Sequence, residues 1–178
     1  MAGGLDIRID IDDREIRAAL NRLLRATGNL TPAMKNIGEY LVQATEERFN
    51  RQSDPDGQKW PEVAPATRAR KKHPKVLTES HHLRGSIHPQ ADRHSVTVGT
   101  NVPYGAIHQF GFEGEVSIPA HERLIKVAFG KALKQPVRAR IRPYTVRRNL
   151  PARPFLGLSE QDREEILAII ADHLDRAR

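Results

Sequence analysis

The segment from residue 115 to residue 150 constrains the fold most, because it carries the whole positive excess of the chain. It holds nine Lys and Arg against two acids, whereas the rest of the chain holds twenty basic and twenty acidic side chains. Residues 116–118 begin an alternating pattern, and 137–142 read VRARIR, in which apolar residues alternate with arginines. Such alternation is typical of strands, and one face here is too charged for a core. The segment predicts an extended basic β-hairpin arm with its tip near Gly130.

The N-terminal part predicts a strand followed by a helix. Residues 5–11 alternate strictly between apolar and charged side chains, which is the period of a strand with one buried face. Asp12 and Glu15 have the spacing of a capping box, and apolar residues then recur at helical spacing until Gly28. We expect the first helix over this stretch.

Two further helices have recognisable starts. Thr31 offers a capping hydroxyl, Pro32 suits the first helical position, and an apolar stripe continues toward Phe49. Ser159 is expected to cap a last helix over residues 160–176, with acidic side chains near its positive end.

The middle of the chain predicts short elements. Residues 54–57 read DPDG, a strong turn sequence, and residues 67–75 are too charged to pack. Residues 86–90 and 95–99 have the pattern of a hairpin, and 101–110 have that of a short helix.

Together these patterns predict an α+β fold, in which helices flank a small antiparallel sheet. A long basic β-hairpin arm and a C-terminal helix complete the predicted fold. The length of 178 residues suits one domain. We therefore expect a single domain over 1–178, with 115–150 as a protruding arm.

Composition excludes several classes of protein. The absence of cysteine excludes disulfide frameworks, thiolate metal sites and cysteine nucleophiles. No apolar run approaches the ~20 residues that cross a bilayer, and the N-terminus lacks the apolar core of a signal peptide. We expect a soluble protein that is made in the cytoplasm and does not enter a membrane.

The sequence offers no recognisable catalytic or metal site. Adjacent His81 and His82 would point in different directions on a helix or a strand, so they are poorly placed to share one ion. His108 and His121 lack a partnered nucleophile or acid at a known spacing, and the common nucleophile, phosphate-loop and dinucleotide motifs are missing. We expect no catalytic residues, no metal and no cofactor.

Several blocks of the chain share the pattern of a known family. They span roughly residues 30 to 174 in the family's order: Phe49, DPDGQKWP at 54–61, Thr67, LT through LRGSI at 77–87, VGT at 98–100, YGAIHQFG at 104–111 and PARPFLGLS at 151–159. In these blocks the chain resembles the phage virion morphogenesis family, the tail-completion proteins of Mu-like phages. It departs from the family pattern at Glu79-Ser80, and its 115–150 segment is longer than in many relatives.

The resemblance implies a non-enzymatic structural protein of the virion, located at the tail or neck, that completes the tail and joins it to the head. It implies a homo-oligomeric ring of about six subunits around the DNA channel, with tail-tube and head-side connector proteins as partners. Two alternatives stay open: a head-side capsid assembly factor, and a DNA-binding module.

Seven residues in the shared blocks are predicted to form a subunit or partner interface: Trp60, Tyr104, His108, Gln109, Phe110, Arg153 and Phe155. Helical spacing places Tyr104, Ile107 and His108 side by side with Gln109 elsewhere, and we expect His108 to be a hydrogen-bonded packing residue. Pro154 holds Arg153 extended, which suits either an arginine that pairs with a carboxylate across a joint or an intrachain salt bridge.

Five arginines are predicted to face DNA or a partner: Arg138, Arg140, Arg142, Arg147 and Arg148. Clustered basic side chains bind phosphates by displacing counterions, which allows a non-specific contact with packaged DNA. Tyr144 is the one aromatic residue in this arginine-rich return, so a base-stacking platform is not expected. A solvated or subunit-facing strand pair fits equally well.

Overall fold

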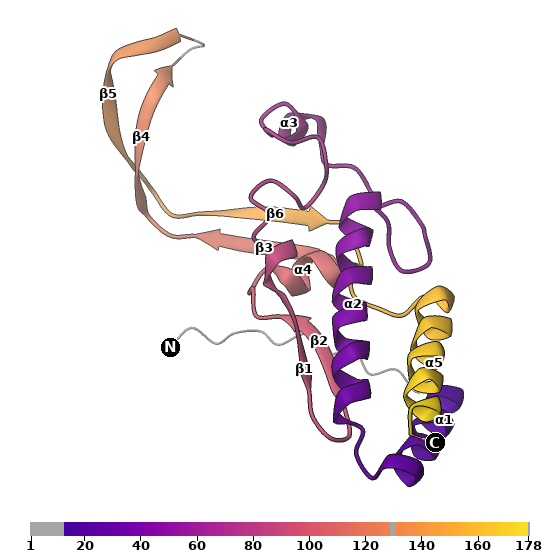
Figure 1. Ribbon diagram of the computed structural model, residues 1–178. Coiled ribbons are helices and arrows are strands. Elements are labelled where there is room, and N and C mark those ends of the chain that lie inside the picture. The colour runs from indigo at the N-terminus through magenta and orange to yellow at the C-terminus, as the bar shows by residue number, and fades with distance from the viewer. Residues whose placement is uncertain (1–12, 129–130, 178) are drawn as a thin grey trace. The chain divides into compact units, whose positions relative to one another are not determined.

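The computed structural model describes residues 13–128 and 131–177, and these residues confirm the predicted α+β class. They contain helices and short antiparallel strand pairs (Figure 1). In chain order the elements are α1 (Arg14–Thr27), α2 (Thr31–Arg51), α3 (Pro65–Arg68), the 3-10 turn η1 (Arg84–Ser86), β1 (Ile87–Ala91), β2 (Val96–Thr100), α4 (Gly105–Phe110), β3 (Phe112–Ile118), β4 (His121–Ala128), β5 (Lys131–Ile141), β6 (Tyr144–Leu150) and α5 (Glu160–Asp175). None of the helices in this described part is long and apolar enough to cross a membrane.

The chain divides into two compact units. The first, here called the body, contains the described residues up to Gly111 and from Pro151 onward, and therefore all the helices. The second, here called the strand unit, is Phe112–Leu150 and contains β3, β4, β5 and β6. A single domain with a protruding arm stays a prediction.

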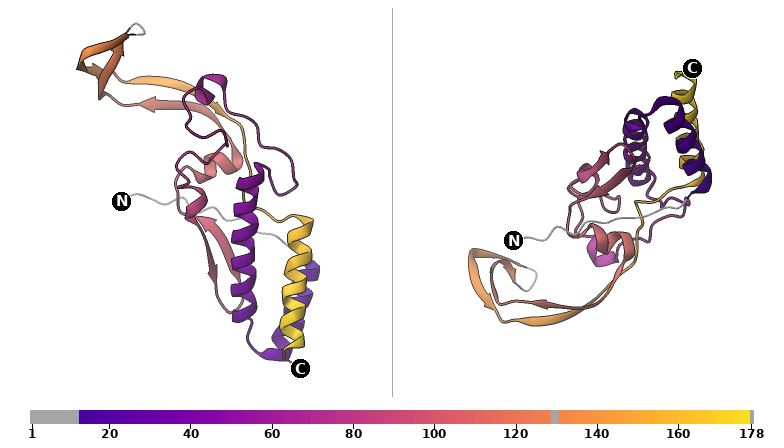
Figure 2. Two further views of the ribbon diagram at one scale, coloured as in Figure 1. Left: turned by 45° about the horizontal axis from the view of Figure 1, so that its top comes forward. Right: turned by 90° about the horizontal axis from the view of Figure 1, so that it is seen from below.

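Helix α2 is the central element of the body. It packs against β1 and β2 on one side and against α5 on the other, and α1 packs on α5 (Figures 1 and 2). Gly38 permits the approach to the hairpin, because an added Cβ would lie 2.9 Å from Pro89 Cβ and 3.0 Å from Val96 Cγ2. The C-terminal helix α5 therefore contacts both α1 and α2.

The body has two apolar clusters, and α2 contributes to both. One lies among the three long helices and consists of Ala19, Leu23, Leu30, Ala33, Met34, Ile37, Ile166 and Ile170. The other joins the C-terminal half of α2 to the loops and consists of Phe49, Trp60, Leu83, Ile87, Val102, Phe155 and Leu156. In the second cluster the Phe49 ring lies 5.3 Å from the Trp60 ring and 5.5 Å from the Phe155 ring, measured between centroids. Burial of these side chains is the main source of stability in the body.

The predicted start of the second helix needs a correction. The capping residue of α2 is Leu30, whose side chain makes no capping bond, so the expected Thr31 cap is wrong. Thr31 is already helical, and its amide donates to the Asn29 side chain at 3.0 Å. At the start of α1, the Asp13 carboxylate accepts hydrogen bonds from the amides of Glu15 and Ile16, at 2.9 Å and 3.0 Å.

The other predicted elements appear close to their expected positions. Strands β1 and β2 pair antiparallel with Ile87 opposite Thr100, and the turn between them is held by the Asp92 carboxylate. Gly28 ends α1 with a φ of 68°, and Ser159 caps α5 in a capping box with Asp162. The predicted strand at 5–11, the Asp12 cap and the tip at Gly130 lie outside the described residues.

The strand unit consists of two antiparallel pairs. β3 pairs with β6 from Phe112 opposite Leu150 to Ile118 opposite Tyr144, and β4 pairs with β5 from His121 opposite Ile141. Side chains of β3 alternate between half-buried and exposed along its whole length. The alternation of apolar and charged residues in the sequence therefore corresponds to strands with two different faces.

Candidate functional site

The segment 151–159, PARPFLGLS, is the point where the parts of the body meet. The Arg153 amide donates to the His108 carbonyl at 2.7 Å, and the Trp60 indole nitrogen donates to the Pro154 carbonyl at 2.8 Å. Phe155 is fully buried between Phe49 and its neighbours. A segment without regular structure is thus fixed by bonds from α4 and from the loop after α2.

Gln109 supplies three of these bonds from α4. Its side-chain nitrogen donates to the Leu156 carbonyl at 2.8 Å, and its side-chain oxygen accepts from the amides of Phe155 and Leu156 at 3.0 Å each. Gln109 is only 5% exposed. The amide therefore satisfies backbone groups that would otherwise be buried without partners.

Arg48 and Asp162 form a buried ion pair at the other end of the segment. The Arg48 guanidinium donates to the Asp162 carboxylate and to the carbonyls of Phe155 and Gly157, at 3.0 Å and 2.9 Å for the carbonyls. Burial lowers the pKa of Arg48, and the Asp162 charge opposes that effect. Sequence reasoning missed this pair, because it lies between two helices whose contact the sequence does not specify. An arginine at the buried face of α2 was the available signal.

Among the described residues, Arg153 binds backbone carbonyls and forms no ion pair, and a pair across a subunit joint stays a prediction. Its Nε donates to the Pro61 carbonyl at 2.8 Å and its Nη2 donates to the Glu62 carbonyl at 3.1 Å. The residue is 4% exposed, and burial lowers the pKa of its guanidinium. The expectation of a carboxylate partner is wrong within the subunit, because backbone carbonyls occupy the guanidinium.

His108 also differs from its prediction. Its ring packs edge-on against Tyr104 with centroids 5.9 Å apart, but Nδ1 is buried and finds no hydrogen-bond partner among the described residues. Burial lowers the pKa of His108, and the positive charge of Arg153 lowers it further. The expected hydrogen-bonded histidine is therefore a packing residue that the fold holds in its neutral form.

Two of the predicted interface residues lie at the surface. Tyr104 is 40% exposed and its hydroxyl lies 2.9 Å from His82 Nδ1, while Phe110 is 64% exposed. Trp60, Gln109, Arg153 and Phe155 are buried inside the body. Those four side chains hold the fold together, and an interface role for any of the seven stays a prediction.

The five predicted arginines of the strand unit are all exposed. On the β4–β5 pair, Arg138 lies opposite Leu124 and Arg140 opposite Glu122. On the β3–β6 pair, Arg147 lies opposite Glu115 and Arg148 opposite Gly114. Arg142 lies between β5 and β6. The arginines are thus distributed over both strand pairs.

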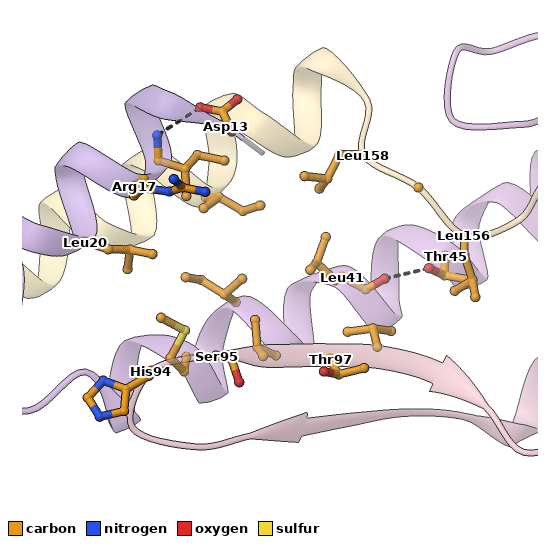
Figure 3. Close-up of a pocket in the computed structure, with 17 residues that line it drawn as sticks. Asp13, Arg17, Leu20, Leu41, Thr45, His94, Ser95, Thr97, Leu156 and Leu158 are labelled. Atoms are coloured by element: carbon orange, nitrogen blue, oxygen red, sulfur yellow. Dashed lines mark hydrogen bonds between the residues drawn. The ribbon is translucent and has the colours of Figure 1, made fainter. Parts of the chain in front are cut away.

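A cavity of about 390 Å³ opens in the body among α1, α2, β2 and α5 (Figure 3). Most of its lining is apolar, including Leu20, Leu41 and Leu158. Two of its polar groups are engaged, because Asp13 caps α1 and the Thr45 hydroxyl donates to the Leu41 carbonyl at 2.8 Å. Within residues 13–128 and 131–177, no three acidic or histidine side chains gather as metal ligands.

The chain is similar in sequence to proteins of phage Mu and of a Mu-like prophage. The chain is 33% identical over 168 residues to Mu-like prophage FluMu G protein 2 of Haemophilus influenzae. The aligned region covers 94% of this chain and 95% of that protein. The chain is also 27% identical over 179 residues to the putative capsid assembly protein G of Escherichia phage Mu. That alignment covers 97% of each of the two proteins. No solved structure matched the chain. The phage virion morphogenesis family matches residues 11–175, and the chain therefore belongs to the phage virion morphogenesis family.

Proposed function

We propose that the protein completes the phage tail and joins it to the head, as a ring-forming subunit at the neck of the virion. Family membership supports a role in virion morphogenesis. The observation that carries the finer proposal is the surface of the strand unit, where Leu124, Val127, Val137, Tyr144 and Leu150 are exposed among the arginines. Exposed apolar side chains on short two-stranded pairs suit pairing with further strands of another protein. The strand unit is the part of the subunit that meets its neighbours.

We propose further that the protein is not an enzyme. The polar side chains around segment 151–159 are occupied by structural bonds: Gln109, Arg48 and Arg153 all bind backbone carbonyls. A catalytic side chain needs a free polar group that faces the substrate. The polar groups of these three side chains instead bind backbone carbonyls inside the body. These bonds hold segment 151–159 in place within the body.

The experiment that tests the ring is a measurement of mass in solution over a range of concentrations, followed by imaging of any assembly. A closed oligomer, alone or with tail-tube protein, supports the proposal. A protein that stays monomeric at high concentration and in the presence of tail-tube protein contradicts it.

A head-side role is the second candidate, because the phage Mu relative carries the name of a putative capsid assembly protein. The two roles place the subunit differently. Locating the subunit in a reconstruction of the virion decides between them: density at the tail end of the neck supports tail completion, and density within the capsid contradicts it.

Contact with DNA is the remaining alternative for the strand unit. If Arg138, Arg140 and Arg142 bind phosphates, duplex binding weakens steeply with salt, and their replacement by Gln lowers the salt slope by about one per lost contact. Weak binding that the three replacements leave unchanged removes this alternative.

A further inference from the structure

Within the described ranges, strands β3 and β6 each have one edge without a partner strand. Among the described residues they pair only with each other, as a two-stranded sheet. Such a pair on its own is marginally stable in water, and an open edge presents a row of amide and carbonyl groups ready to pair with another strand. A further strand at each edge would pair these amide and carbonyl groups and would stabilise the sheet.

The two strands carry opposite charges. β3 reads FEGEVSI, with two acids and no base, whereas β6 reads YTVRRNL, with two arginines and no acid. Glu113 and Glu115 share one face with Arg147, because Glu115 lies directly opposite Arg147 and alternate residues point the same way. Arg147 Nη2 lies 2.8 Å from Glu113 Oε1, and both side chains are exposed.

The other face of the pair is mainly apolar. Val116 lies opposite Val146, and Ile118 lies opposite Tyr144. Val116, Ile118 and Val146 are half-buried, while Tyr144 is 47% exposed and Leu150 is 37% exposed. Arg148 also belongs to this face, opposite Gly114. A further strand of the same kind would extend the charged face and the apolar part of this face around Val116 and Val146.

We propose that β6 of one copy pairs antiparallel with β3 of the next copy, so that the joint between subunits repeats the pairing found inside one subunit. This inference rests on the proposed function, since it names the joint of the proposed ring. The partner is a second copy of this chain because the acidic strand and the basic strand lie on opposite edges of one pair. A contact between different edges is head-to-tail, and head-to-tail contacts related by rotation close into rings.

The experiment mixes two variants that disrupt the joint in opposite senses. The acidic-edge variant is Glu113→Arg with Glu115→Arg, and the basic-edge variant is Arg147→Glu. Each alone places like charges across every joint and also within its own β3–β6 pair, so circular dichroism first checks that each variant is folded. We expect each folded variant to associate about tenfold more weakly than the unchanged protein, because several cross-strand pairs change from attraction to repulsion. An equimolar mixture restores opposite charges at every joint and is expected to recover the assembly, with both variants in equal number by native mass spectrometry.

The control is Arg138→Glu with Arg140→Glu, which changes charge on β5 and leaves β3 and β6 untouched. The control keeps an acidic β3 and a basic β6, so it is expected to assemble on its own like the unchanged protein. Mixed with the acidic-edge variant, it offers opposite charges at only one of that variant's two edges, so closed assemblies that contain both are expected to be rarer than those formed with the basic-edge variant. If a charge-reversed chain fails to fold by circular dichroism, the neutral changes Glu113→Gln, Glu115→Gln and Arg147→Gln take its place, with an expected weakening of about threefold.

Two outcomes overturn the inference: reversed variants that assemble as well as the unchanged protein, and a mixture that does not recover. In either case an assembling unchanged protein leaves the proposed function standing. An unchanged protein that stays monomeric overturns the proposed function itself.

Discussion

Arg48 on α2 and Asp162 in the first turn of α5 form a buried ion pair although they are 114 positions apart in the sequence. The same carboxylate accepts the Tyr40 hydroxyl at 3.0 Å and the Ser159 amide at 2.7 Å. One acidic side chain therefore ties the start of α5 to α2 and closes the capping box of α5. Segment 151–159 enters α5 at this point and is fixed there.

Removal of Arg48 should destabilise the body strongly. An Arg48→Met variant leaves the Asp162 charge buried without its cation and frees two backbone carbonyls, which should cost about 3–5 kcal/mol of unfolding free energy. Urea denaturation measures the loss. Arg51→Ala provides a control on the same helix, because its pair with Glu47 is 64% and 47% exposed and should contribute less than about 1 kcal/mol. Equal losses in the two variants would contradict the structural role of the buried pair.

Gln109 should be equally sensitive to loss of its amide. A Gln109→Leu variant keeps the size of the side chain but leaves one carbonyl and two amides of segment 151–159 without partners. Because each orphaned buried group costs about 1–3 kcal/mol, we expect a loss of at least about 2 kcal/mol in urea denaturation. Gln43→Leu, at an exposed position of α2, is the matched control and should change stability by less than about 0.5 kcal/mol. A Gln109→Leu protein as stable as the control would refute the assignment.

Gly157 is needed for two separate reasons. Its φ is 151°, and an added Cβ would lie 2.7 Å from Pro55 Cγ. Gly157→Ala should therefore cost about 1–3 kcal/mol of unfolding free energy. Pro55→Ala in the same chain removes the contact but not the backbone strain, so it should restore only part of the loss. Thermal unfolding of the single and double variants distinguishes the two causes, and complete recovery would show that backbone strain contributes nothing.

His108 should make stability depend on pH in a mildly acidic range. Burial and the charge of Arg153 hold its pKa below the ordinary value of 6.5, so the folded state favours the neutral ring. Its full contribution is present above pH 6.5 and is lost as the pH falls toward the lowered pKa, because the unfolded chain binds the proton first. Urea denaturation measures the unfolding free energy at about pH 7.5 and at about pH 5. The decrease between the two pH values should be smaller for His108→Phe than for the unchanged protein. Equal losses would mean that His108 does not titrate in this window.

Local sequence signals predicted most of the secondary structure. The Ser159 cap, the glycine that ends α1 and the alternating residues of the β1–β2 hairpin all act through neighbours a few positions away. The misplaced cap at Thr31 shows the limit of such signals. Several Asx and hydroxyl side chains cluster there, and the geometry of the turn selects one of them.

The long-range hydrogen bonds of the candidate site could not be predicted from local sequence signals. The sequence marked Gln109 and Arg153 as members of a shared pattern, but it did not show that Gln109 binds segment 151–159 or that Arg153 binds Pro61 and Glu62 carbonyls. Those partners lie 46 to 92 positions away. Only the packing of α4 and the loop after α2 against the segment brings the groups together.

The sequence by itself determined the α+β class, the approximate extents of the long helices, and the concentration of positive charge in 115–150, since each depends on local spacing and composition. The tertiary structure decided which polar side chains are buried and with what partners. Arg48, Asp162, Gln109 and Arg153 are ordinary polar residues in the chain, and they become determinants of the fold only where desolvation makes an unpaired group costly.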